Sequence, residues 1–220
     1  MTPPPVRGVA FDWGGVFTVG TFDGRAIARL AALFGLDEAT VRPTYLGLME
    51  VFEVGGFDLP TFAHRLARAF GREIGVDVDE GAFRTAFLDA PRERPAAYAL
   101  AAGLPPDVAV GMLSNNVPEL CDRVRTDPRL GRIERFVFSN EIGVRKPDPA
   151  AFVALSEAMH LPPHEILFVD DAPRNVEAAA SLGFVALLLD EPAAFAARWR
   201  AALPALAYLV DGTGWTATDS

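Results

Sequence analysis

Residues 6–16 read Val-Arg-Gly-Val-Ala-Phe-Asp-Trp-Gly-Gly-Val, a short apolar run that ends in an acid and two glycines. Its hydrophobicity is continuous rather than alternating, which is typical of a strand buried on both faces of a parallel sheet. Asp12 directly follows the predicted strand Val6–Phe11, at the edge where open parallel sheets bind their ligands. An aspartate before glycines is also common in ordinary turns. The stretch therefore predicts a buried strand and makes Asp12 a candidate functional residue.

Four later stretches show the same short, continuous hydrophobicity, and helix-like segments separate most of them. The predicted strands are Val108–Leu113, Phe136–Ser139, Ile166–Val169 and Val185–Leu189, and the clearest helices between them are Pro118–Arg125, Pro149–His160 and Asn175–Leu182. Asp148 is expected to cap the helix that starts at Pro149, and Gly183 is expected to end the following helix. This order indicates an α/β fold with a doubly wound, Rossmann-like parallel sheet.

A helical insertion is predicted between the first and the second strand. This region holds several amphipathic, helix-like stretches and no convincing strand, the clearest being Arg25–Phe34, Pro60–Phe70 and Glu80–Asp89. We expect residues 18–95 to form a helical cap, joined through one linker with Gly20 and Gly24 and another at Pro91 to Pro95. Residues 1–17 and 96–220 would form the core, with a loose tail after about Gly212.

Composition and charge limit the classes of partner. Half of the 220 residues are hydrophobic and the net charge is -9, so we expect a globular protein that binds neither nucleic acid nor an anionic membrane. No apolar run approaches the roughly 18 residues needed to span a bilayer, and no secretory signal pattern opens the chain. We expect a cytoplasmic monomer or homodimer, in which the single cysteine, Cys121, is a core residue.

Polar residues also follow the second and third predicted strands. Ser114, Asn115 and Asn116 end the second strand, where they could offer a hydroxyl and amides to an oxyanion or simply cap a helix. Lys146 follows the third strand, directly before Pro-Asp-Pro. A lysine in such a loop is commonly solvated, but this one could also point into the same sheet edge.

The fourth predicted strand ends in two adjacent acids, Asp170 and Asp171, with Asn175 shortly after. Adjacent carboxylates repel one another, so that either both are solvated or a positive charge holds them together. Magnesium favours carboxylate oxygens and can supply that charge. The pair is therefore a candidate metal site.

These four features occur in the order of the motifs of the haloacid dehalogenase-like superfamily, which the chain resembles from Val6 to about Leu189. The resemblance is to subfamily IA, whose helical cap of the C1 type corresponds to the insertion. It implies a magnesium-dependent phosphatase that acts on a small organic phosphate, for example a sugar phosphate, through an aspartyl-phosphate intermediate. By resemblance the nucleophile is Asp12, with Ser114 and Lys146 as further catalytic residues and Ser114, Asn115 and Lys146 as the phosphate-binding residues. The implied metal ligands are Asp12, the Gly14 carbonyl and Asp170, with Asp171 either a further ligand or the residue that fixes Lys146.

One position departs from the family pattern. Family phosphatases carry a second aspartate two residues after the nucleophile, which protonates the leaving alcohol and activates water, and here that residue is Gly14. Such general acid and base help is worth about 10² to 10⁴ in rate. A weakly active or non-catalytic phosphate-binding protein, or a haloacid dehalogenase, therefore stays open as an alternative. A further alternative is that an acid of the insertion, Asp23 or Glu53, replaces the missing one.

Overall fold

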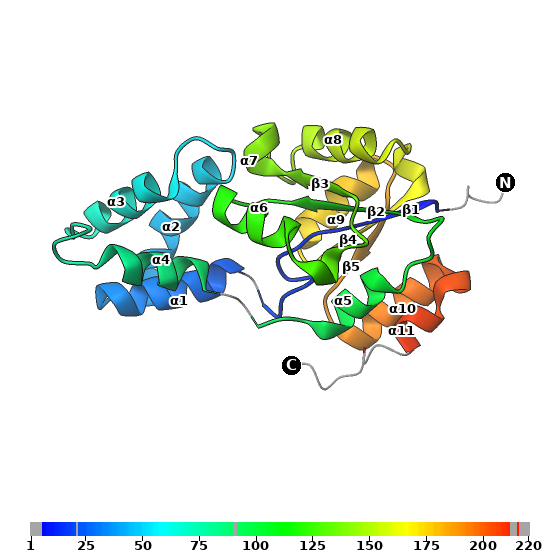
Figure 1. Ribbon diagram of the computed structural model, residues 1–220, viewed down its shortest axis with the longest axis horizontal. Helices are drawn as coiled ribbons and strands as arrows, with labels where there is room; N and C mark the ends of the chain where they lie inside the picture. Colours follow the sequence, from blue (N-terminus) through cyan, green and yellow to red (C-terminus); the bar gives the residue numbers. More distant parts are fainter. Residues whose placement is uncertain (1–5, 21, 90–91, 212–214, 216–220) are drawn as a thin grey trace.

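The computed structural model describes residues 6–20, 22–89, 92–211 and 215, and within them five parallel strands form one sheet (Figure 1). The strand order is β3-β2-β1-β4-β5. The strands are β1 (Gly8–Phe11), β2 (Ala109–Ser114), β3 (Arg135–Phe138), β4 (Ile166–Asp170) and β5 (Val185–Leu188). The predicted doubly wound parallel sheet is thereby confirmed.

Alternate residues of the central strand β1 enter two separate hydrophobic clusters, one on each face of the sheet. Val9 and Phe11 belong to one cluster and Ala10 to the other. Because both faces are covered, the strand carries no polar side chain in its interior, which explains its continuous hydrophobicity.

Helices cover both faces of the sheet (Figure 1). Phe152 of α8 and Ala179 of α9 pack on one face, while Leu100 of α5, Leu120 of α6 and Trp199 of α10 pack on the other. The core helices are α5 (Pro95–Ala102), α6 (Pro118–Arg125), α7 (Ser139–Ile142), α8 (Pro149–Met159), α9 (Pro173–Ser181), α10 (Pro192–Ala202) and α11 (Tyr208–Asp211), with single 3-10 turns at Pro128–Leu130, Pro163–Glu165 and Pro204–Leu206. None of the described helices is long and apolar enough to cross a membrane.

Two predicted helix boundaries are confirmed by the local geometry. Asp148 caps α8, since its carboxylate accepts a hydrogen bond of 2.8 Å from the amide of Ala150. After α9, Gly183 takes a left-handed φ of 90°, a backbone conformation that glycine adopts without steric cost. Each boundary thus depends on a residue that the sequence already marks.

The insertion contains four helices between residues 22 and 88 and lies beyond the carboxyl ends of the strands (Figure 1). They are α1 (Phe22–Phe34), α2 (Glu38–Phe52), α3 (Leu59–Ala69) and α4 (Glu80–Leu88). α2 was not among the clearest predicted helices, because Pro43 and Gly47 lie inside it and both disfavour helix. Its packing on α1 and α3 outweighs these local preferences.

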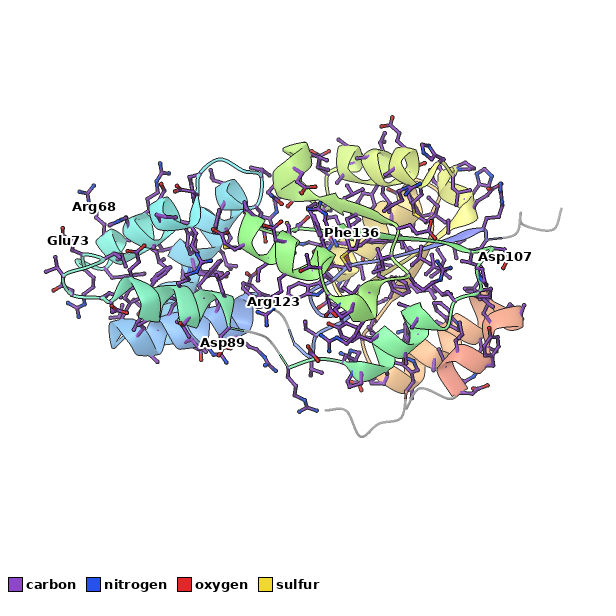
Figure 2. The ribbon with its side chains drawn as sticks, in the orientation of Figure 1. Arg68, Glu73, Asp89, Asp107, Arg123 and Phe136 are labelled. Atoms are coloured by element: carbon purple, nitrogen blue, oxygen red, sulfur yellow. The ribbon has the colours of Figure 1, made fainter. Side chains whose placement is uncertain are left out.

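The chain enters and leaves the insertion at one place. Thr18 and Glu93 form an isolated antiparallel bridge, and the amide of Val19 donates to the carbonyl of Arg92 at 2.7 Å. A second contact joins the two parts nearby, where Arg123 of α6 donates to the carbonyl of Leu88 at 3.2 Å. Figure 2 shows Arg123 near Asp89, the residue that follows Leu88. The insertion is therefore held to the core on the side of the strand ends.

The predicted loose tail after Gly212 lies largely outside the described residues. Trp215 is the exception, and it is buried with its ring centroid 4.7 Å from that of Phe195 in α10. At this residue the expectation of a loose tail is wrong, because the indole packs into the hydrophobic core.

Candidate active site

The register of the sheet brings the ends of three strands to one edge. Phe11 pairs with Met112 of β2 and with Val169 of β4. Asp12 and Asp170, the residues that follow Phe11 and Val169, therefore emerge side by side. The amide of Asp12 fixes this placement by donating to the Val169 carbonyl at 2.8 Å.

A buried lysine stands between these two acids. Lys146 Nζ lies 3.0 Å from Asp12 Oδ1 and 2.6 Å from Asp170 Oδ2, and Lys146 and Asp170 are 1% and 0% exposed. Burial alone would lower the pKa of Lys146, but the two carboxylates outweigh it and raise the pKa above its usual value. The ammonium therefore stays charged and holds the two acids together.

Asn115 positions the loop that carries Lys146. Its side-chain amide donates to the Lys146 carbonyl at 3.0 Å, and its Oδ1 accepts from the Lys146 amide at 2.8 Å. Two hydrogen bonds from one planar group fix the loop against the end of β2. Both polar atoms of Asn115 already have protein partners, so its predicted contact with phosphate stays a prediction.

The acid that pairs with the lysine is Asp170. It also accepts hydrogen bonds from the Ala172 amide at 2.8 Å and from Asn175 Nδ2 at 3.0 and 3.1 Å. Asp171 lies elsewhere, against Gly15, where a Cβ built on the glycine would stand 1.9 Å from Asp171 Oδ2. Asp171 was expected either to bind the metal or to fix Lys146. In the structure the contact with Lys146 is made by Asp170.

Three carboxylates meet at this edge with a spacing that suits one metal ion. Asp12, Asp170 and Asp171 each offer an oxygen within 4.8 Å of the others. Burial is the largest cause that raises the pKa of Asp12 to about 7, and the charges of Asp170 and Asp171 raise it further against the effect of Lys146. Burial and Asp170 likewise raise the pKa of Asp171 to about 6. An all-oxygen donor set with excess negative charge fits a hard divalent cation.

A cavity of about 170 Å³ opens beside the acids, between the core and the insertion. The core contributes Asp12, Gly14 and Asp171 to its lining, and the insertion contributes Phe22, Asp23 and Met49. Among the described residues, nothing lies within 4 Å of a Cβ built on Gly14, and φ at this glycine is outside the left-handed region. The position of the missing second acid is therefore open space beside the cavity.

Ser114, a further predicted phosphate-binding residue, ends β2 and is 1% exposed. The hydroxyl has a long contact of 3.5 Å to the Asn115 carbonyl, and among the described residues that line the cavity, Asn115 and Asn116 are present and Ser114 is not. Its role with phosphate stays a prediction.

Sequence reasoning missed two arginines near the site. Arg174 lines the cavity, and Arg145 Nη2 lies 3.1 Å from Glu53 Oε2 of the insertion. The only signal in the sequence was that Arg145 precedes Lys146 and that Arg174 lies three residues after Asp171. This signal is weak, because surface arginines next to a motif are common. Arg145 thus contacts the insertion, while Arg174 lies in α9 of the core.

Known proteins are similar to this chain in sequence and in fold. D-ribitol-5-phosphate phosphatase of Bacteroides thetaiotaomicron is 26% identical over 189 residues, covering 81% of this chain and 89% of that protein. A haloacid dehalogenase-like hydrolase from Porphyromonas gingivalis superposes with a TM-score of 0.68 at 25% identity, covering 92% of this chain and 98% of the other. A haloacid dehalogenase family enzyme of B. thetaiotaomicron, crystallised with magnesium and inorganic phosphate, superposes with a TM-score of 0.70 at 20% identity over 84% and 94%.

The family model of haloacid dehalogenase-like hydrolases matches residues 6–183, from just before the central strand β1 to just after α9. That range contains Asp12, Lys146 and the acidic pair of Asp170 and Asp171, and it spans well over half of the chain. The chain therefore belongs to the haloacid dehalogenase-like hydrolase family.

Proposed function

We propose that this protein is a magnesium-dependent phosphatase of small organic phosphates that works through an aspartyl phosphate on Asp12. One observation carries the proposal: the Asp12 carboxylate lines the cavity, stands 3.0 Å from Lys146 Nζ and shares its edge with Asp170 and Asp171. A nucleophile, a fixed cation and a metal-binding acid cluster are what phosphoryl transfer to a carboxylate requires.

The charges of the site address the main obstacle to this reaction, which is repulsion between a phosphate dianion and an anionic nucleophile. Lys146 lies beside Asp12 and offsets its charge. Bound Mg²⁺, held by Asp12, the Gly14 carbonyl, Asp170 and Asp171, would supply the remaining positive charge. Fixed charges in a partly enclosed site stabilise the transferring group better than water does.

The size of the cavity and a relative support a small phosphorylated polyol or sugar as the substrate. The cavity of about 170 Å³ leaves room for few atoms beyond the phosphate. The similarity to D-ribitol-5-phosphate phosphatase points to the same class of molecule.

We propose that residues 18–95 act as a cap that limits access of water to the site. Contacts between the two parts support this role. The Ser139 hydroxyl donates to the Glu53 carbonyl at 2.5 Å, and Glu53 also pairs with Arg145. A covered site strengthens electrostatic interactions and protects a reactive intermediate. The cytoplasmic location and the monomeric or dimeric state stay predictions.

A panel of phosphometabolites, assayed with Mg²⁺ and with EDTA, tests the proposed function. We expect release of inorganic phosphate from polyol or sugar phosphates with Mg²⁺ only, and none from Asp12→Asn, because an amide cannot accept the phosphoryl group. Acid quenching during turnover should trap phosphate on the peptide that contains Asp12. Turnover by purified Asp12→Asn would contradict the mechanism.

Gly14 keeps the dehalogenase alternative in view, since dehalogenases of this family also lack the second aspartate. Metal-free assays with 2-chloropropionate distinguish the two activities. Chloride release that is unaffected by EDTA would favour the dehalogenase, whereas phosphate binding without turnover would favour a non-catalytic protein.

A further inference from the structure

On the core side of the cavity, Gly14 occupies the position where family phosphatases carry a second aspartate. Gly14 lines the cavity without a side chain, and the space where a carboxyl group would stand is open. An alkoxide leaves a phosphate ester poorly without a proton. A proton donor for this site must therefore come from another part of the cavity wall.

Asp23 of the insertion is placed on that wall. It lies in the first turn of α1 and lines the same cavity as Asp12 and Gly14. The hydroxyl of Tyr45, from α2, donates to Asp23 Oδ1 at 3.0 Å. Tyr45 is fully buried and packs edge-on against Phe62 with ring centroids 5.7 Å apart. A rigid neighbour thus fixes one carboxylate oxygen and leaves the other for a ligand.

The other acid of the insertion near the site is differently placed. Glu53 Oε2 lies 3.1 Å from Arg145 Nη2, and among the described residues that line the cavity, Asp23 is present and Glu53 is not. Glu53 therefore connects the insertion to the core, while Asp23 faces the space that a substrate would fill.

We infer that Asp23 is the general acid and base of this enzyme, supplied by the insertion in place of the aspartate that Gly14 replaces. The inference rests on the proposed phosphatase function. As Asp12 attacks phosphorus, the bond from phosphorus to the leaving oxygen breaks, and that oxygen takes the proton of the Asp23 carboxyl group. The Asp23 carboxylate then takes a proton from water, whose oxygen attacks phosphorus. The bond from phosphorus to Asp12 breaks, which releases inorganic phosphate and restores both acids.

Burial and the neighbouring polar and charged groups set the pKa of Asp23. Burial raises the pKa of Asp23, while the hydrogen bond from Tyr45 and the charges of nearby arginines lower it. The groups near it are Tyr45 and Arg42 of α2, Glu53 directly after α2, and Arg145 and Arg174 of the core, while the acids Asp12 and Asp171 line the same cavity. Burial has the larger effect, which favours the protonated form that the first step needs.

The test compares two phosphate esters in Asp23→Asn, since protonation matters for one leaving group and not for the other. With ribitol 5-phosphate, we expect kcat to fall by about 10² to 10⁴, with a much smaller change in KM. With p-nitrophenyl phosphate the first step needs no proton, so we expect a burst of about one nitrophenolate per active site, followed by slow release of phosphate. Phosphorylated Asp12 should accumulate.

Three further variants serve as controls. Glu80→Gln makes the same kind of change in the exposed first turn of α4 and should leave both activities at the wild-type level. Tyr45→Phe should shift the limb of the pH profile that reports Asp23 to higher pH, because it removes a hydrogen bond that lowers the pKa. Adding Gly14→Asp to Asp23→Asn should restore part of the turnover of ribitol 5-phosphate.

The outcomes separate the two proposals. The role of Asp23 alone would be overturned if Asp12→Asn abolished turnover while Asp23→Asn left it intact. It would also be overturned if Asp23→Asn lowered turnover equally for both esters and gave no burst. No turnover of either ester by the wild type would overturn the phosphatase function and this inference with it. A burst with p-nitrophenyl phosphate and rescue by Gly14→Asp would establish the role.

Discussion

Lys146 is the cation between two acids in a place that water hardly reaches, so its removal has a structural cost besides a catalytic one. Lys146→Met would leave Asp12 and Asp170 with no cation between them. We expect the free energy of unfolding of the metal-free protein to fall by about 3–5 kcal/mol, the usual cost of breaking a buried pair from one side. Urea unfolding measures this. Adding Asp170→Asn to Lys146→Met should restore part of the lost free energy of unfolding. If the double variant instead lost the sum of what the two single variants lose, the pairing would be contradicted.

Gly14 and Gly15 are neighbours with opposite tolerance for a side chain. Gly15→Ala would place a Cβ 1.9 Å from Asp171 Oδ2, at a φ of 74°, whereas Gly14→Ala meets open space. We expect Gly15→Ala to lose about 1–2 kcal/mol of stability from backbone strain and to bind Mg²⁺ more weakly, because Asp171 must move. Calorimetric titration with Mg²⁺ compares the variants. Equal affinities in both would show that Asp171 is not held in place by the glycine.

At the scale of elements, the insertion is held to the core through the start of α7. Ser139 accepts from the Asn116 amide at 3.0 Å and donates to the carbonyl of Glu53, which follows α2. We expect Ser139→Ala to loosen the insertion, which raises KM several-fold and speeds proteolysis between residues 18 and 95. Ser156→Ala removes a hydroxyl of α8 whose one partner among the described residues is the nearby Leu161 carbonyl, and it serves as the matched control. Identical proteolysis of the two variants would argue against this contact as a hold.

Local signals predicted the elements well and their mutual contacts poorly. The apolar runs, Asp148 before Pro149 and Gly183 are visible in the sequence because each acts within a few residues. Tyr45 and Asp23 are 22 residues apart, and Ser139 and Glu53 are 86 apart. No periodicity reports which helix of the insertion faces the sheet edge. The sequence therefore indicated which core residues gather at the site and offered Asp23 and Glu53 as candidate acids of the insertion. Which of these two lines the cavity required the fold.

For the whole molecule, the acids of the site make stability depend on pH and metal. The folded pKa values of Asp12 and Glu53 are about 7 and that of Asp171 is about 6, against ordinary values of 3.8 for aspartate and 4.5 for glutamate. Between the ordinary pKa values and the raised ones, the folded state binds more protons than the unfolded state, so the free energy of unfolding falls as pH rises. The contribution of these groups is complete below their ordinary values and is lost by about pH 7.

We therefore expect the melting temperature of the metal-free protein to fall between about pH 5 and pH 7, and Mg²⁺ to restore most of that loss by binding the ionised acids. Scanning calorimetry with EDTA and with Mg²⁺ measures both effects. Asp171→Asn should melt higher than the wild type in EDTA at neutral pH and gain less from Mg²⁺. A metal-free melting temperature that rises over this range would contradict the assigned pKa values.

The bridge between Thr18 and Glu93 places the two ends of the insertion next to each other. The core chain is therefore nearly continuous across the junction, and a short turn could close it. An arrangement of this kind lets one core carry different insertions, because exchanging the residues between Thr18 and Glu93 leaves the sheet and its register unchanged. If the insertion also supplies the general acid, as inferred for Asp23, then replacing the insertion changes substrate recognition and acid catalysis in a single event.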